Sequence, residues 1–208
     1  MKVAIIDYQL SNLFSVKHAF DYLKVDSEIT SDKTIIANSD AAVIPGVGAF
    51  ADAMKNLKDL DLINLIKDFI SSGRQFMGVC LGMQLLLSES EEFGKHQGLN
   101  IIKGKVIKFS SKDKKIRVPQ IGWNQILKEG KNWGNSPFRN INNNEFMYFV
   151  HSYYVVPQDK SVILSETVYE DIKYCSSLLS GNVFATQFHP EKSGKEGIKI
   201  YKDWLNLL

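Results

Sequence analysis

Residues 75–87 read Gln-Phe-Met-Gly-Val-Cys-Leu-Gly-Met-Gln-Leu-Leu-Leu, and the rest of the chain is interpreted around this stretch. The apolar run Phe76–Val79 predicts a buried parallel strand, and the apolar residues that follow, up to Leu87, predict the start of a helix. Cys80 lies at the junction between two glycines in the pattern Gly-x-Cys-x-Gly, which is the thiol version of a nucleophile elbow. The nucleophile of an elbow has a strained backbone, and side chains two residues to either side would collide with the turn. The N-terminus of the predicted helix would favour the thiolate form of Cys80.

A free cysteine is most often a small buried hydrophobe, and Cys80 considered alone favours that interpretation. A candidate base lies far along the chain, in Gln-Phe-His-Pro-Glu at residues 187–191. His189 at a strand end can take the thiol proton, and Glu191 can fix the imidazole tautomer if Pro190 turns the chain back. We therefore predict a triad of Cys80, His189 and Glu191. The alternative is a surface histidine beside a solvated acid.

Composition and charge narrow the class of protein. The chain has 208 residues, of which 44% are hydrophobic and 23% charged, as expected for one soluble globular domain over residues 1–208. Its net charge of +2 is too small to argue for nucleic acid or an anionic membrane as partner. No run approaches the roughly 20 apolar residues of a membrane span, and the apolar run near Met1 is too short for a signal peptide. The two cysteines form neither a disulfide framework nor a metal-ligand spacing, so we expect a cytoplasmic protein without metal or cofactor.

The order of the predicted elements indicates an α/β fold. In the first half, predicted strands at 3–6, 25–29, 41–44 and 76–79 alternate with predicted helices at 11–23, 51–57 and 62–71. This alternation predicts an open, mostly parallel sheet with helices on both faces. Further strands, expected as antiparallel additions, are predicted at 103–109, 124–127, 145–150, 162–167, 173–177 and 183–188. We also expect an exposed loop at 130–144, a hairpin turn at 180–182 and a last helix at 197–207.

A glycine-rich turn, Pro-Gly-Val-Gly at residues 45–48, ends the strand predicted before the elbow strand. Acyl chemistry on an amide creates an oxyanion that needs two N–H donors. The backbone of Leu81, directly after the nucleophile, would supply one donor, and the backbone at Val47 and Gly48 would supply the other. Alone, such a turn indicates no chemistry, and it lacks the glycine and lysine pattern of phosphate loops.

The segment 148–154, Tyr-Phe-Val-His-Ser-Tyr-Tyr, predicts a strand whose polar and aromatic end lines a pocket. His151 competes with His189 as the base, but no acid follows it at a suitable spacing. We therefore expect His151 to be structural or to position the substrate, and the aromatic residues to pack in the core.

Together these motifs resemble the class I, or triad, glutamine amidotransferases over essentially the whole chain. The elbow and His-Pro-Glu are specific to that class. Pro-Gly-Val-Gly, Gly-Trp-Asn at 122–124 and Phe-Val-His-Ser-Tyr at 149–153 resemble the glutaminase subunits of imidazole glycerol phosphate synthase, from histidine biosynthesis. The resemblance implies a flavodoxin-like fold and the hydrolysis of glutamine to glutamate and ammonia through a glutamyl thioester.

The resemblance also implies roles for further residues. Gln84 and Glu92 would hold the amino-acid end of glutamine, and the backbone at Ser152 and Tyr153 would take its carboxylate. The residues implied at an interface with a partner are Asn12, Trp123, Tyr148 and Lys192. The implied partner is a TIM-barrel cyclase that receives ammonia through a sealed tunnel and makes imidazole glycerol phosphate and AICAR. A dry tunnel matters because ammonia in water is protonated and stops being a nucleophile.

Three alternatives stay open at the level of sequence. Gln9 and Ser11 replace glycines that family members usually carry near the partner surface, so a paralogue that supplies ammonia for bacterial surface-sugar synthesis fits as well. A stand-alone cysteine hydrolase, with γ-glutamyl hydrolase as the nearest example, would show a similar elbow and need no partner. A non-catalytic binding subunit predicts the loss of Cys80, His189 or Glu191, and all three are present.

Overall fold

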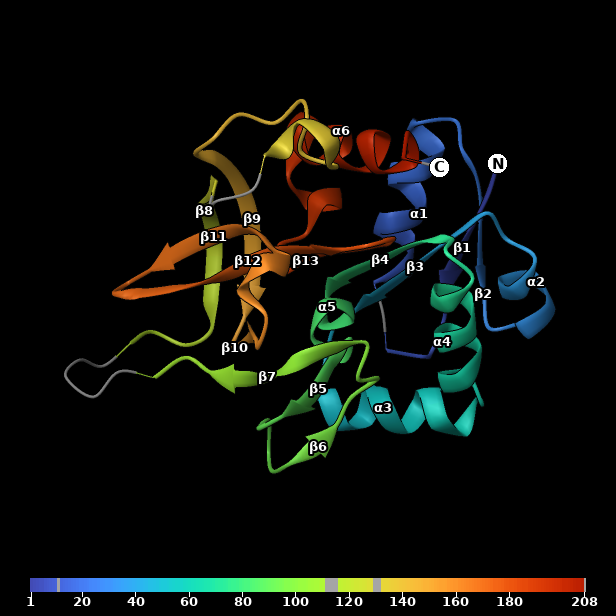
Figure 1. Ribbon diagram of the computed structural model, residues 1–208, viewed down its shortest axis with the longest axis horizontal. Coiled ribbons are helices and arrows are strands. Elements are labelled where there is room, and N and C mark those ends of the chain that lie inside the picture. The colour runs from blue at the N-terminus through green and yellow to red at the C-terminus, as the bar shows by residue number, and fades with distance from the viewer. Residues whose placement is uncertain (11, 111–115, 129–131, 208) are drawn as a thin grey trace.

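The computed structural model describes residues 1–10, 12–110, 116–128 and 132–207 (Figure 1). The strands are β1 (Lys2–Ile6), β2 (Asp26–Thr30), β3 (Ala41–Gly46), β4 (Gln75–Cys80), β5 (Leu87–Ser90), β6 (His96–Gln97), β7 (Ile102–Lys108), β8 (Gln120–Lys128), β9 (Glu145–His151), β10 (Tyr153–Pro157), β11 (Ile163–Tyr169), β12 (Ile172–Ser180) and β13 (Val183–Thr186). The helices are α1 (Leu13–Tyr22), α2 (Lys33–Ala37), α3 (Phe50–Asp59), α4 (Ile63–Ser71), α5 (Leu81–Leu85) and α6 (Gly194–Leu205). Single 3-10 turns occur at Trp133–Asn135, Lys160–Val162 and Pro190–Lys192.

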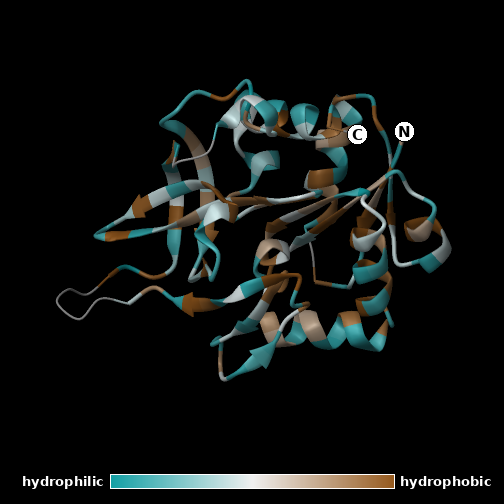
Figure 2. Cartoon of the chain, viewed as in Figure 1, coloured by the Kyte–Doolittle hydropathy of each residue, from teal (hydrophilic) through white to brown (hydrophobic). Residues whose placement is uncertain are grey.

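The first four strands of the chain and β13 build a parallel sheet. Strands β2, β1, β3, β4 and β13 lie in that order, and each neighbouring pair is parallel. Helices α1 and α6 lie on one side of these strands, and α3 and α4 lie on the other (Figure 1). Alternate residues of β1 enter different cores: Val3 and Ile5 pack with the residues of α1 and α6, whereas Ala4 and Ile6 pack with those of α3 and α4. A strand covered on both faces reads as a continuous apolar run, which confirms the predicted α/β layering (Figure 2).

The second half adds mostly antiparallel strands. The pairs β13–β12, β12–β10, β10–β7, β12–β11, β11–β8 and β8–β9 are all antiparallel. The turn at residues 180–182 joins β12 to β13, with Gly181 at φ +57°, as predicted for a hairpin. One added pair, β5 with β7, is parallel. The prediction of antiparallel additions to a parallel sheet is therefore confirmed with two exceptions, because β5 pairs in parallel with β7 and β13 pairs in parallel with β4.

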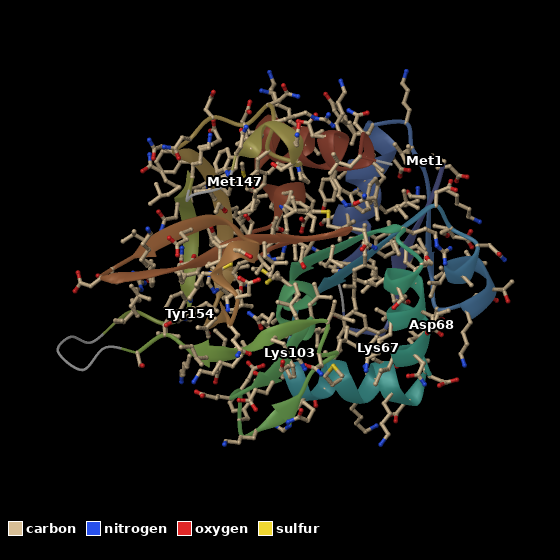
Figure 3. All side chains as sticks on the ribbon, in the orientation of Figure 1. Met1, Lys67, Asp68, Lys103, Met147 and Tyr154 are labelled. Atoms are coloured by element: carbon tan, nitrogen blue, oxygen red, sulfur yellow. The ribbon has the colours of Figure 1, made fainter. Side chains whose placement is uncertain are left out.

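Strands β8 and β9 form an antiparallel ribbon with one apolar side turned outward. In β9, Met147 (labelled in Figure 3) is buried, whereas its neighbour Phe146 is 50% exposed. The register pairs Trp123 with Tyr148 and Ile121 with Val150 on the outer side. We call this outer side, made of Ile121, Trp123, Phe146, Tyr148 and Val150, the β8–β9 face.

Several predicted elements need correction. The helix after Cys80 ends at Leu85 and does not run through Leu87, because Leu87 begins β5 and pairs with Ile102. Sequence reasoning also missed α2, β5, β6 and β10. Asn12 directly precedes α1, but its side chain makes no capping hydrogen bond to the helix backbone.

The expected exposed loop at 130–144 is wrong for much of its length. Trp133, Phe138 and Ile141 are buried there, and residues 130 and 131 lie outside the described part of the chain. The Trp133 indole donates a hydrogen bond to the carbonyl of Leu164, and Phe138 packs edge-on against Phe184. Asparagine-rich composition predicted solvent exposure, but the aromatic residues within it complete the core beside β13.

Candidate active site

Cys80 ends β4 in a strained backbone conformation. Its φ of +54° and ψ of −109° are rare for any residue other than glycine. A Cβ at Gly82 would lie 1.8 Å from the carbonyl oxygen of Ile44, and one at Gly78 would lie 2.9 Å from the Gly82 backbone. The two glycines are therefore required by the close approach of β3, β4 and α5. The elbow geometry predicted from the sequence is confirmed.

A pocket of about 300 Å³ opens beside Cys80. It is lined by Val47, Gly48, Cys80, Leu81, Gln84, Glu92, Pro119, Val150, His151, Ser152 and Tyr153. This set includes the predicted nucleophile, the predicted oxyanion residues and the residues expected to hold glutamine. Its volume suits a small polar ligand of amino-acid size.

His189 and Glu191 form a buried ion pair next to the elbow. Nδ1 of His189 lies 2.7 Å from Oε1 of Glu191, and each side chain is only 2% exposed. The 3-10 turn at Pro190–Lys192 brings the acid back to the histidine, as the sequence predicted. The Tyr201 hydroxyl donates to the other carboxylate oxygen of Glu191 at 3.4 Å. The acid is thus held from two sides.

The second nitrogen of His189, Nε2, is buried and has no hydrogen-bond partner among the described residues. Burial lowers the pKa of His189, but Cys80 and Glu191 outweigh burial and raise it to about 10. The site thus favours the imidazolium form of His189 beside the Glu191 carboxylate, and a positive charge next to the cysteine is what an activated thiol nucleophile needs.

The backbone of His189 is fixed by β9. The His189 N–H donates to the carbonyl of Tyr148 at 3.0 Å, and the Ser193 hydroxyl donates to the His189 carbonyl at 2.7 Å. The same hydroxyl accepts from the Tyr148 N–H at 3.0 Å. Sequence reasoning missed both Ser193 and Tyr201, since nothing in their local sequence signals these contacts.

The glycine-rich turn holds one of its amides away from the pocket. The Val47 N–H donates to the carbonyl of Leu10 at 3.1 Å, so it is not offered to an oxyanion in this conformation. Gly48 has φ +105°, which a glycine adopts freely. Gln9, which replaces a family glycine, has φ +69° and so keeps the backbone shape that glycine would give. Ser11, the second replacement, lies outside the described residues.

Comparison with known proteins accords with this geometry. The family model described as glutamine amidotransferase class-I matches residues 4–206. The chain belongs to the class-I glutamine amidotransferase family. Curated relatives of this amidotransferase include the imidazole glycerol phosphate synthase subunit HisH of Syntrophotalea carbinolica, 44% identical over 97% of this chain and 98% of the relative. The HisH subunit of Aquifex aeolicus is 42% identical over 98% of this chain and 96% of the relative.

Solved structures give the same fold. PurLQS from Thermotoga maritima matches the amidotransferase with a TM-score of 0.74 over 99% of this chain and 97% of that chain, at 18% identity. A structure titled as a glutamine amidotransferase matches with a TM-score of 0.71 at 17% identity, over 99% of this chain and 97% of that one. At such low identity these matches establish the flavodoxin-like fold alone.

The residues expected to bind glutamine line the pocket of the amidotransferase. Nε2 of Gln84 donates to the Tyr153 carbonyl and to Oε1 of Gln187, each at 3.0 Å. Both of its N–H donors are thereby used, so the group that Gln84 can still offer to a ligand is its Oε1 acceptor. Glu92 accepts from the Phe50 N–H at 2.6 Å, at the N-terminus of α3. Burial raises the pKa of Glu92, and the Phe50 N–H opposes this shift.

His151 is buried and structural in its contacts. Its Nδ1 lies 2.8 Å from the Tyr153 carbonyl, so Nδ1 carries the proton, and its Nε2 faces the Tyr174 hydroxyl at 3.2 Å. Burial lowers the pKa of His151 to about 3, which keeps the ring neutral. These contacts fit the prediction that His151 is structural or positions the substrate and is not the base of the triad.

None of the four residues expected at a partner interface belongs to the pocket lining. Trp123 is 56% exposed and contacts Tyr148 edge-on, with ring centroids 6.1 Å apart. Lys192 is exposed in the turn that carries Glu191, and Asn12 is half-buried before α1. Among the described residues no cluster of three or more His, Cys, Asp or Glu side chains has the arrangement of metal ligands. No helix in the described ranges is long and apolar enough to cross a membrane.

Proposed function

We propose that this amidotransferase is the glutaminase subunit of an imidazole glycerol phosphate synthase. It hydrolyses glutamine and passes the ammonia to a TIM-barrel subunit, which makes imidazole glycerol phosphate and AICAR. The observation that carries the proposal is the buried His189–Glu191 pair beside the strained Cys80, in a chain that resembles curated HisH subunits over nearly its full length. We take residues 1–208 as one domain that acts in the cytoplasm, in keeping with two free cysteines.

The triad performs two acyl transfers. The Cys80 thiolate attacks the side-chain amide carbon of glutamine, and the His189 imidazolium gives its proton to the leaving nitrogen, so that ammonia departs and a thioester remains. A water molecule then loses a proton to His189 as its oxygen attacks the thioester carbon. Glutamate leaves, and the sulfur returns to the thiolate. Glu191 keeps the imidazole oriented and stabilises its charge in both steps.

The pocket offers groups for each part of glutamine. The carboxylate of Glu92 suits the α-ammonium, and the Gln84 Oε1 acceptor suits an N–H of the same substrate. The backbone at Ser152 and Tyr153 would take the α-carboxylate. Val47, Gly48 and Leu81 would stabilise the oxyanion once the Val47 N–H leaves Leu10.

The β8–β9 face supports docking of a partner beside this pocket. Exposed aromatic residues that gather on one sheet face are the usual anchors of an interface. Trp123 and Tyr148 lie at the centre of the face, and Val150 belongs both to the face and to the pocket lining. A subunit seated there would cover the pocket mouth and could receive ammonia without exposure to bulk water.

The alternatives differ in acceptor or in their need for a partner. The paralogue that serves surface-sugar synthesis shares the same glutaminase chemistry, and HisH relatives at 40–44% identity favour the histidine pathway. A stand-alone hydrolase has no use for the exposed β8–β9 face and would need its oxyanion hole formed without a partner.

The deciding experiment replaces the nucleophile in the complex. Cys80→Ala should abolish glutamine-dependent synthesis and leave ammonia-dependent synthesis by the partner intact. Cys175→Ala is the matched control, because Cys175 is the other free thiol and is buried away from the pocket lining. Loss of both activities in Cys80→Ala would make Cys80 a structural residue and would refute the proposal.

A further inference from the structure

The sulfur of Cys80 has a hydrogen-bond donor that the triad does not include. Nε2 of Gln187 lies 3.7 Å from Sγ and donates to it. Gln187 follows β13, two residues before His189, and its side chain is completely buried. A buried amide has few ways to satisfy its hydrogens, so the contact with sulfur is a built feature of the site.

A chain of contacts fixes which end of the Gln187 amide faces the sulfur. The Tyr153 carbonyl can only accept, so the Gln84 atom that faces it at 3.0 Å is the nitrogen. That same nitrogen lies 3.0 Å from the Gln187 side chain, which must therefore present its oxygen there. The remaining end of the Gln187 amide is the N–H group, and it points to Cys80.

The backbone of Gln187 is fixed as well. Its N–H donates to the Ser176 carbonyl at 2.8 Å, which continues the pairing of β12 with β13 past the last residue of β13. Main chain and side chain are thus both held, and the amide cannot turn away from the sulfur without breaking the bond to Gln84.

The neighbours of Sγ favour different charge states. The carbonyl of Val150 lies 3.9 Å from Sγ and can accept only from a thiol. The Gln187 N–H donates best to a thiolate, because a hydrogen bond to an ionised acceptor is about twice as strong as one to a neutral acceptor. These two contacts compete, and the Gln187 N–H is the one that stabilises the ionised form.

We propose that Gln187 is a catalytic residue of this amidotransferase, whose side-chain N–H holds the Cys80 sulfur as a thiolate and directs it into the pocket. The proposal deepens the proposed glutaminase function, on which it rests for the role of Cys80 as nucleophile. The donor serves both half-reactions. It stabilises the attacking thiolate before the thioester forms, and it stabilises the thiolate again as the leaving group when water attacks the thioester.

The test measures ionisation of the thiol directly, without glutamine. The rate of Cys80 alkylation by iodoacetamide is recorded against pH for the full chain, with Cys80→Ala to show which thiol reacts. Gln187→Met keeps the length of the side chain and removes the donor. Gln187→Glu replaces the donor with a carboxylate. Gln75→Met is the matched control, since Gln75 is a half-buried glutamine at the start of β4, the strand that ends at Cys80.

For Gln187→Met we expect alkylation at neutral pH to slow roughly ten-fold and the midpoint of the profile to move up by about one pH unit, from the loss of a hydrogen bond to a charged group. Gln187→Glu should move the midpoint further, because its charge repels the thiolate. Gln75→Met should match the wild type. Thermal unfolding of each variant separates this effect from a loss of fold.

Two results would overturn the inference. One is a wild-type profile in a folded Gln187→Met. The other is an equal shift in Gln187→Met and Gln187→Glu, which would mark Gln187 as a packing residue. If neither variant folds, Gln84→Met supplies the measurement: it frees the Gln187 amide and should shift the midpoint in the same direction by less, and an unchanged midpoint would refute the proposal. A shifted profile, together with no glutaminase activity in the complex with the acceptor-loaded partner, would instead refute the proposed function and leave the thiolate contact standing.

Discussion

At the scale of single residues, the protonation of His189 links the candidate site to the stability of the fold. The pKa of His189 is about 10 in the folded chain, against an ordinary value of 6.5. A raised pKa in the folded state means a stabilising contribution that is complete below pH 6.5 and is lost as the pH rises through 10. The protein should therefore lose this contribution to its stability between pH 6.5 and about pH 10.

Glu191→Gln tests this linkage. The substitution removes one of the two groups that raise the pKa of His189, so the variant should lose stability relative to wild type below pH 6.5. The difference in free energy of unfolding should then narrow as the pH rises toward 10. Urea unfolding at a series of pH values measures this difference in free energy. Wild type and variant share all their other titrating groups, so those groups cancel in the comparison. A difference that stays constant with pH would contradict a charged His189–Glu191 pair.

Tyr201→Phe tests how the triad acid is held. The change removes the hydroxyl that donates to Glu191 and keeps the ring, which packs edge-on against Phe20 at 5.1 Å between centroids. We expect the rate of glutamine hydrolysis in the complex to fall roughly threefold, because the hydrogen bond that is lost is long and therefore weak. Tyr154→Phe is the control, because its ring packs on Phe109 away from the triad acid. Equal rates in both variants would leave Glu191 positioned by His189 alone.

The three residues of the proposed triad could be selected from the sequence because each lies in a short local motif. Gly-x-Cys-x-Gly and His-Pro-Glu each fix a backbone shape as well as a functional group, so the sequence names Cys80, His189 and Glu191 directly. Gln187, Tyr201 and Ser193 were not predictable. Each contacts the site through residues far away in sequence or through backbone carbonyls, and their types are common in any buried environment.

At the scale of elements, the turn between β3 and α3 sets the resting state of the site. Its Val47 N–H is bonded to Leu10, and α3 begins at Phe50, where Glu92 accepts a hydrogen bond. The turn is thus tied at one end to the β1–α1 connection and at the other to a residue that lines the pocket. Rotation of the peptide before Val47 is the smallest change that would complete an oxyanion hole.

The isolated chain should therefore be a poor glutaminase. Loss of one oxyanion donor typically lowers turnover by roughly 100- to 1,000-fold, and we expect a difference of this order between the free chain and its complex with an acceptor-loaded partner. Glutamate release by the pure chain, with and without the partner, measures it, and Cys80→Ala sets the background. Full activity in the free chain would show that Val47 is not needed as a donor.

Elements of the parallel half were predicted well because strands buried on both faces give continuous apolar runs. The short elements were not. Strand β6 has only two residues, and α5 ends after five because Leu87 is drawn into pairing with Ile102. In these places tertiary pairing decides the local structure, and no window of sequence contains the partner strand.

At the scale of the whole molecule, the β8–β9 face and the triad share one framework. Tyr148 lies on that face, while its backbone is bonded to both His189 and Ser193. A partner that presses on Tyr148 would therefore bear on the strand that positions the base. Coupling between two subunits needs a structural element whose position is affected both by the partner and by the active site, and β9 is such an element.

Lys192 is the charged residue through which this coupling can be measured. It directly follows Glu191 in the 3-10 turn, its N–H donates to the His189 carbonyl at 3.0 Å, and its side chain is exposed. Lys192→Ala should leave the fold and the alkylation rate of Cys80 nearly unchanged, because neither depends on the ammonium group. It should weaken the stimulation of glutaminase by an acceptor-loaded partner. Loss of one member of a desolvated interfacial ion pair costs roughly 2–5 kcal/mol, and loss of a rim pair costs under about 1 kcal/mol.

The measurement is a titration of the variant with the partner, with glutamate release followed at saturating acceptor. Lys195→Ala is the matched control, since Lys195 is exposed at the start of α6, just past the same turn. A loss of affinity or stimulation confined to Lys192→Ala would place the partner's acidic group over the triad turn. Equal behaviour of the two variants would make Lys192 a solvated surface charge. The contact that transmits the partner's state would then lie on the β8–β9 face, at Trp123 and Tyr148.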